Sequence, residues 1–427
     1  MAFNYMNNLT KKWWFKWLII GVLIRLILMP ITLHPDLWGH SFTAYFFSHE
    51  GIFNIYDHLL SLPQSHPLVA NFGVGDIFIY PPLTYFTLGM FRFAVKPLTD
   101  PNFIPWLMEN LGNIHNYKGL YWHLFIFKLP YLFVDLATGF LLASIFKDKH
   151  KRKLAFVLWI FNPVTLYATF MMGQLDIIPV FFTVLSLYFA SRKKLCWAMV
   201  SLGIGGSFKM YPLLLIPIAA FIFGDNTFRK VKYLVVGVLP YVLTIAPFLG
   251  SAAFRSMVLL NPKSQKMLFM IWKMSGAEGI YPFILILSLL YFISWYSRKK
   301  VSLKYFFLGA LLLLFSTTHY HPQWFLWVTP FLVLGLVGNN FKHLLIVLIL
   351  FFSWVTITLF FEPSLSIGLF NPIWPQLENA VGFSEFLSKW IDVYQIKSVI
   401  RSVFAGASIY LVFSKFRLED RKSVGIN

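Results

Sequence analysis

The stretch WWFKWLIIGVLIRLILMPITLHPD, residues 13–36, decides the fold of this chain. It begins with about 20 residues that are nearly all apolar, the length that an α-helix needs to cross the hydrocarbon core of a bilayer. It ends in His34-Pro35-Asp36, where the chain becomes polar. The stretch therefore predicts a membrane-spanning helix with a carboxylate just beyond its end.

The composition extends this prediction to the whole chain. Hydrophobic residues make up 58% of the 427 residues, aromatic residues 19% and charged residues only 12%. A soluble domain of this composition would lack the polar surface needed to cover its core. The sequence predicts an all-α, polytopic transmembrane helical bundle, with residues 1–427 forming a single integral-membrane domain.

The positions of the basic residues predict how the chain is oriented in the membrane. Lys and Arg outnumber Asp and Glu by 36 to 17, and they gather in short loops between apolar runs. The positive-inside rule places such loops, and with them both termini, in the cytoplasm. Nucleic acid is therefore not an expected partner, whereas the lipid bilayer is. The single cysteine, Cys196, excludes an intramolecular disulfide. The basic loops are at residues 147–153, 192–194, 229–232 and 298–300.

Counting apolar runs from a cytoplasmic N-terminus predicts about twelve crossings. Long non-cytoplasmic segments follow at about 34–121, 250–279 and 362–396, the first with interfacial or re-entrant helices. The segment 79–95 is apolar enough to cross, and whether it does so is left open. The predicted crossings are 13–33, 122–146, 153–172, 175–191, 196–207, 209–223, 231–249, 280–297, 304–318, 323–337, 342–361 and 397–415.

Asp36 is the leading candidate for a functional carboxylate, because it lies at the exit of a span and acids are scarce. A simple helix N-cap is the alternative. Asp176, in the turn Met172-Gly173-Gln174-Leu175-Asp176, has the same two interpretations: a helix cap, or a group that joins Gln174 and Asp36 in one pocket.

Lys209 interrupts an apolar region too short for two ordinary spans. A charged lysine there is costly, which favours an anionic partner such as a phosphate over a side chain that only extends to the interface. His319 and His321 form a short turn in which hydrogen bonding to a phosphate or a sugar is preferred to metal binding. No metal ligand is assigned, although a divalent metal stays open. Arg255 belongs to a basic lining of the second long loop.

The ordered motifs resemble the C-type membrane glycosyltransferases, particularly the glycosylphosphatidylinositol mannosyltransferases and their prokaryotic relatives. The resemblance covers about 34–330, and each motif alone is weak. His34 stands where eukaryotic members have a further acid. The residues that carry or extend the match are Asp36, His34, Tyr80-Pro81-Pro82-Leu83, Asn162-Pro163, Gln174-Leu175-Asp176, Lys209-Met210-Tyr211-Pro212 and His321-Pro322-Gln323-Trp324-Phe325-Leu326-Trp327.

The resemblance implies a hexosyltransferase that moves a sugar, mannose by preference, from a polyprenyl-phosphate donor to a glycan or lipid acceptor on the non-cytoplasmic face. Asp36 would then be the general base of an inverting displacement, with Lys209 stabilising the leaving phosphate. The donor-binding set would be His34, Tyr80, Gln174, Asp176, Lys209, Tyr211, Arg255, His319, His321 and Gln323.

Two other classes of protein remain as alternatives: a transporter, and a flippase or polymerase of lipid-linked saccharides. The sequence leaves open whether a small membrane partner subunit is needed. The expected location is the cell (cytoplasmic) membrane, because the long loops lack Asn-x-Ser/Thr sites.

Overall fold

The computed structural model describes residues 12–296 and 302–424, so the basic loop at 298–300 lies outside the described residues. Helices make up nearly all the regular structure in these ranges. The exception is a small antiparallel hairpin of two-residue strands, β1 (Trp272–Lys273) and β2 (Gly279–Ile280). The all-helical membrane fold is confirmed at this level.

Four apolar helical segments in the described residues are long enough to cross a membrane. They are α9 (Leu120–Ile145), the segment Lys149–Met171, the segment Thr227–Phe248, and Val393–Phe416 of α22 (Val393–Val424). The second combines α10 (Lys149–Ile160), α11 (Pro163–Thr165) and the π-helix η3 (Leu166–Met171), and the third combines α15 (Thr227–Ile245) and η5 (Ala246–Phe248). A fifth span is counted if α2 (Phe15–Ile31) and α3 (Asp36–His49), which are bent by 85°, form one unit.

Twelve crossings are therefore not confirmed. The other apolar runs form helices of 10–17 residues, which at about 1.5 Å per residue are shorter than a bilayer core of about 30 Å. Prolines and polar turns interrupt these runs, which hydropathy alone counts as full spans. These segments are α12 (Ile177–Ser191), α13 (Leu195–Gly206), η4 (Tyr211–Leu215) with α14 (Ile216–Phe223), α17 (Pro282–Tyr296), α18 (Leu303–Thr317), η8 (Pro322–Trp327) with α19 (Thr329–Gly338), and α20 (Leu344–Leu359).

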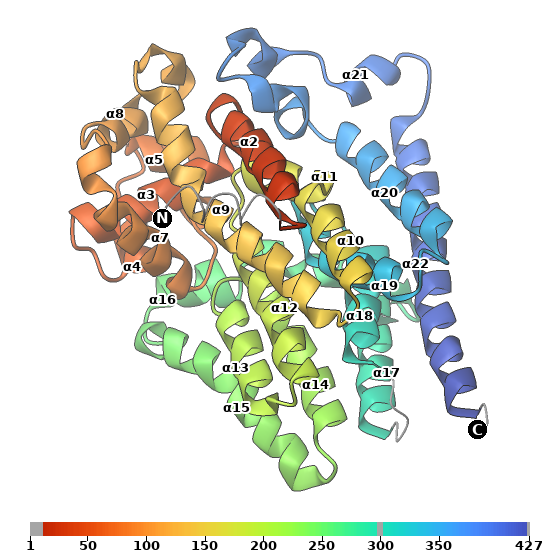
Figure 1. Ribbon diagram of the computed structural model, residues 1–427. Coiled ribbons are helices and arrows are strands. Elements are labelled where there is room, and N and C mark those ends of the chain that lie inside the picture. Colours follow the sequence, from red (N-terminus) through yellow and green to blue (C-terminus); the bar gives the residue numbers. More distant parts are fainter. Residues whose placement is uncertain (1–11, 297–301, 425–427) are drawn as a thin grey trace, which may run out of the picture.

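The region 34–121 folds into short helices that gather beside α9 (Figure 1). They enclose a hydrophobic core of their own, in which Tyr56, Tyr85 and Phe103 are fully buried. Besides α3, these elements are α4 (Ile55–Ser61), α5 (Pro67–Phe72), α6 (Val74–Ile77), α7 (Pro82–Ala94), η1 (Lys96–Leu98), α8 (Phe103–Glu109) and η2 (Leu111–Asn116).

Further short elements connect the longer helices. They are α16 (Ala252–Phe254), η6 (Arg255–Leu259), η7 (Pro262–Leu268), η9 (Pro363–Leu365), η10 (Ile367–Phe370), η11 (Pro375–Asn379) and α21 (Phe383–Leu387). Around them the long helices form one bundle, in which α9 packs against α2, α10 and α12, while α13 packs between α12 and α15.

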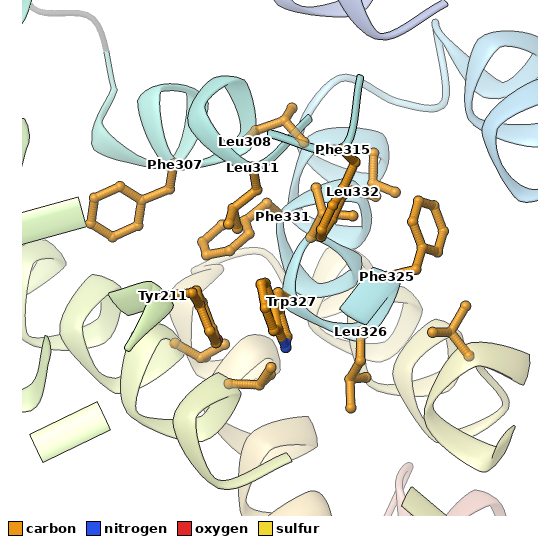
Figure 2. Close-up of a cluster of buried hydrophobic side chains, with 14 of the residues drawn as sticks. Tyr211, Phe307, Leu308, Leu311, Phe315, Phe325, Leu326, Trp327, Phe331 and Leu332 are labelled. Atoms are coloured by element: carbon orange, nitrogen blue, oxygen red, sulfur yellow. The ribbon is translucent and has the colours of Figure 1, made fainter. Parts of the chain in front are cut away.

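The main core is rich in aromatic side chains, and Figure 2 shows the part of it around Trp327. Tyr211 stacks on Trp327 with ring centroids 4.2 Å apart and planes 7° from parallel. The outer helices instead expose large apolar side chains, such as Phe228 on α15 (79% exposed) and Tyr394 on α22 (80%). Such faces suit contact with lipid, and the chain is a multi-pass membrane protein.

Polar and basic loops lie at opposite ends of the bundle. Helix α12, for example, begins directly after Asp176 and ends before the basic turn Arg192-Lys193-Lys194. We call the end that carries Asp176 the polar end. The positive-inside rule predicts that it faces away from the cytoplasm.

Candidate functional site

Four polar side chains from distant segments meet at the polar end, and we call them the polar cluster: Asp36, Gln174, Asp176 and Lys209. Each lies where an apolar helix has just ended or is about to begin. Asp36 begins α3 after α2, Gln174 and Asp176 lie in the turn between η3 and α12, and Lys209 lies between α13 and η4. The sequence predicted that these four residues share one face.

Asp36 is the solvent-exposed member of the cluster. Its side chain is 45% exposed, and its Oδ2 accepts a hydrogen bond from Gln174 Nε2 at 2.7 Å. His34 Nδ1 lies 3.6 Å from the same oxygen. Burial alone would raise the pKa of Asp36, but His34, His40 and the hydrogen bond from Gln174 together hold it below its ordinary value. Asp36 is therefore a fixed, accessible carboxylate at neutral pH.

Asp176 and Lys209 form a buried ion pair. Lys209 Nζ lies 2.8 Å from one carboxylate oxygen and 2.9 Å from the other. Asp176 is fully buried, and the side chain of Lys209 is 12% exposed. Asp176 precedes α12 but makes no side-chain capping bond. Asp176 is thus the N-cap residue of α12, but its carboxylate binds Lys209 and not the backbone N–H groups of the helix.

Aromatic rings surround this ion pair. The indole Nε1 of Trp327 donates to Asp176 Oδ1, and in Figure 2 this nitrogen lies at the edge of the apolar cluster. Lys209 Nζ is 5.3 Å from the ring centroids of both Tyr80 and Trp327 and 6.0 Å from that of Trp324. Cation–π contacts at these distances stabilise the ammonium group.

A buried lysine of α9 positions the two turns that carry the cluster. Lys128 Nζ donates to the carbonyl oxygens of Met29 at 3.0 Å and Met171 at 3.2 Å, one at the end of α2 and the other at the end of η3. Between these turns, Gly173 has φ +77°, and a Cβ there would lie 3.2 Å from Lys128 Cε. Glycine at this position lets the two turns approach each other.

A second group of predicted residues lies beside the cluster. Lys266 Nζ is 2.8 Å from His321 Nε2, and Asp36 and Lys209 both act electrostatically on His321. The His319 ring is exposed and lies 6.2 Å from the His321 ring. Burial, with the charge of Lys266, lowers the pKa of His321 to about 4, so its imidazole is neutral at pH 7.

Four residues named from the sequence have less direct roles. Arg255 is exposed and donates to the carbonyl of Leu249 at 2.7 Å, without a contact to the polar cluster. Gln323 is buried with an unpaired Oε1. Tyr211 contributes through its stack on Trp327. Asn162 caps the helix that follows, because its side chain accepts from Val164 N.

The sequence places Trp327 in a family motif and Lys266 in the basic lining of the second long loop, but it predicts no contact with the polar cluster for the side chains that complete the site. They are Trp327, which binds Asp176, together with Lys266, Lys128 and His40. A hydropathy pattern assigns aromatic residues to the core, so it contains no signal that one indole N–H serves a carboxylate. Within residues 12–296 and 302–424, no three His, Cys, Asp or Glu side chains converge in a way that could hold a metal ion.

His40 gives the site a testable pH dependence. It is 3% exposed, and neither ring nitrogen has a hydrogen-bond partner. Burial lowers the pKa of His40 from 6.5 to about 4. The unfolded chain therefore takes up this proton near pH 6.5, whereas the folded protein does so only near pH 4. Between these values the unfolded state binds more protons, so folding stability falls as the pH is lowered, by at most about 3 kcal/mol.

We expect the apparent Tm in neutral detergent to fall below pH 6.5, and to fall less steeply in His40→Leu. The exposed His150, in the basic loop, provides the control. His150→Leu should reproduce the wild-type pH profile. A His40→Leu profile as steep as that of the wild type would show that His40 is not the titrating group.

The sequence comparisons give a family for most of this region. A family model described as GPI transamidase subunit PIG-U matches residues 88–327. This range includes Gln174, Asp176 and Lys209 but begins after Asp36. Comparison with curated proteins and with solved structures gives no match.

This match overturns the activity expected from the sequence motifs. The members of the matched family are subunits of a protein–lipid ligation complex, so the predicted hexosyltransferase function is wrong. The polyprenyl-phosphate sugar donor is not supported. The transporter and the flippase or polymerase do not fit either. The motifs behind the expectation were an acid at the end of a span, a broken helix and an aromatic turn. Such motifs indicate the architecture of a membrane protein and do not specify a reaction.

Proposed function

Because the chain belongs to the family of the GPI transamidase subunit PIG-U, we propose that it is a membrane subunit of a complex that attaches proteins to glycosylphosphatidylinositol. In this proposal the polar cluster binds the glycan headgroup of that lipid. The polar end faces away from the cytoplasm, as the basic loops predict. Attachment of the protein would take place elsewhere in the complex.

The observation that carries the proposal is the Asp36–Gln174 pair. Asp36 presents an ionised, half-exposed carboxylate, and Gln174 fixes its position through a 2.7 Å hydrogen bond. The other amide atom, Gln174 Oε1, is buried without a donor. The half-exposed Asp36 carboxylate accepts the one bond from Gln174 and can accept more, which suits a ligand rich in hydroxyl groups, such as a glycan.

The aromatic surroundings support the same ligand. Trp324 and Tyr80 are partly exposed beside Lys209, so their rings offer apolar faces next to polar groups. Sites for small ligands commonly combine such surfaces with a few fixed polar contacts. The buried Asp176–Lys209 pair anchors this wall and leaves Asp36 as the free acid.

A basic group beside the cluster supports recognition of the lipid phosphate. His319 is within the electrostatic influence of Lys266, Lys397 and Arg401. Glu362 is the one acid acting on Lys266 and Lys397, so this neighbourhood has a net positive charge. Cationic donors of this kind form strong hydrogen bonds with phosphate oxygens.

Equilibrium binding of a radiolabelled glycosylphosphatidylinositol to the purified full chain in detergent tests the proposal. Asp36→Asn should weaken binding about tenfold or more, because it removes the charged acceptor. Asp57→Asn is the matched control, since Asp57 is an exposed acid outside the cluster. Equal affinity of wild type and Asp36→Asn, or equal affinity for phosphatidylinositol without a glycan, would contradict the proposed site.

A further inference from the structure

A small, partly open cavity lies between α3, α7 and α9. His40 lines it on the side of the polar cluster, and Arg92 lines it from α7. Most of the wall is apolar, which is unusual around a guanidinium group. The apolar lining includes Leu37, Ala44, Leu88, Phe91, Ile126 and Phe127.

Arg92 is buried without an acidic partner. It is 7% exposed, and none of the ion pairs in the described part of the chain includes it. Its polar contact within the protein is a long hydrogen bond of 3.4 Å from Nη1 to the carbonyl of Ser41. The guanidinium also lies 4.1 Å from the ring centroid of Phe127. A guanidinium has five N–H donors, so most of its hydrogen-bonding capacity is not used by protein groups.

The charge of Arg92 persists at neutral pH. Burial lowers the pKa of Arg92 to about 9, which still leaves it protonated at pH 7. A buried cation without a counter-ion is expensive, and a bound anion would remove this cost.

The packing of α7 on α3 directs Arg92 into this position. A Cβ on Gly89 would lie 3.1 Å from the carbonyl oxygen of Ala44, so glycine lets the two helices approach closely. Arg92 follows three residues later on the same face of α7. Because the helices are this close, its side chain is held between α3 and α9 and does not reach the surface freely.

Large apolar side chains are exposed on the two helices, α7 and α9, that flank the cavity. Met90 and Phe93, on the other side of α7, are 68% and 65% exposed, and Phe133 on α9 is 63% exposed. A ligand that satisfies both Arg92 and these apolar surfaces has an anionic head and a hydrocarbon body. A free inorganic anion would meet only the first requirement.

We propose that this cavity, the Arg92 pocket, binds the phosphate of a membrane phospholipid. Arg92 donates to the phosphate oxygens, and the acyl chains follow the exposed apolar surfaces of α7 and α9. The site is separate from the polar cluster and does not depend on the proposed function. It is a lipid site that holds α3 and α7, and through them the region 34–121, against α9.

A lipid titration of the full chain in neutral detergent tests this pocket. Dioctanoyl phosphatidylglycerol should raise the apparent Tm of the wild type in a saturable way, and Arg92→Gln should weaken the apparent affinity about tenfold or more. Lys96→Gln is the matched control, because Lys96 is an exposed cation four residues further on. This variant should bind as the wild type does.

Two further measurements keep the proposal falsifiable. Ala44→Leu fills the pocket but retains Arg92, so it should also weaken the stabilisation by dioctanoyl phosphatidylglycerol. If Arg92→Gln does not fold, Ala44→Leu tests the proposal in its place. Inorganic phosphate alone should give no comparable shift. The proposal is overturned if inorganic phosphate stabilises as well as the lipid does, if the wild type shows no saturable shift, or if Lys96→Gln loses as much affinity as Arg92→Gln.

Discussion

An Arg25→Met variant is expected to be less stable than the wild-type protein by about 3–5 kcal/mol. Arg25 in α2 and Asp135 in α9 form an ion pair in which both side chains are fully buried, with Nε 2.7 Å from Oδ2. The other carboxylate oxygen of Asp135 accepts from Trp159 Nε1 at 2.8 Å. Loss of the guanidinium would leave the Asp135 carboxylate buried among apolar helices without a counter-charge.

The free energy of unfolding, measured by SDS titration in mixed micelles, checks this expectation. The double variant Arg25→Met/Asp135→Leu should recover most of the lost stability, because it removes both charges together. The control is Arg229→Met, whose partner Asp225 is 62% exposed and lies one helical turn away; it should change stability by about 0–1 kcal/mol. An Arg25→Met variant no less stable than this control would contradict the assignment of Arg25–Asp135 as a structural pair.

This pair also shows where sequence reasoning stops. The sequence places Asp135 within an apolar run and offers Lys128, in the same run, as a nearby polar partner. The structure instead pairs Asp135 with Arg25, 110 residues away in sequence, and directs Lys128 toward backbone carbonyls at two helix ends. Local spacing cannot show such pairings, because they depend on which helices pack together.

Helix positions were easier to predict than helix lengths. The expected span 122–146 closely matches α9, whose helix continues through Pro130. The expected spans around Lys209 became short helices with 3₁₀ turns. Hydropathy records the apolar character of a run but not whether its helix continues through a proline or a polar turn.

The candidate site was predictable in part for a physical reason. Acids and lysines near membrane spans are costly. Asp36, Asp176 and Lys209 were therefore identifiable from their positions beside apolar runs. The sequence also placed them on one face. The contacts of Trp327 and Arg92 were not predictable, because an aromatic residue in an apolar run, or a single arginine near the end of one, also has an ordinary structural explanation.

Lys209→Met is expected to have the largest combined effect on stability and binding. Asp176 is fully buried, and Lys209 is its only cationic partner among the described residues. The substitution would leave the carboxylate with the indole N–H of Trp327 as its remaining side-chain donor. Stability should fall by about 3–5 kcal/mol, and glycosylphosphatidylinositol binding should weaken about tenfold or more as the wall beside Asp36 rearranges.

The double variant Asp176→Leu/Lys209→Met separates the two effects. Removing both charges should restore most of the stability, whereas binding should stay weak, because Tyr80 and Trp327 no longer enclose a cation that fixes their positions. Stability and affinity are measured on the same preparation by SDS titration and equilibrium binding. If the double variant binds as tightly as the wild type, the ion pair is only a structural support, and the glycan site must depend on Asp36 and Gln174 alone.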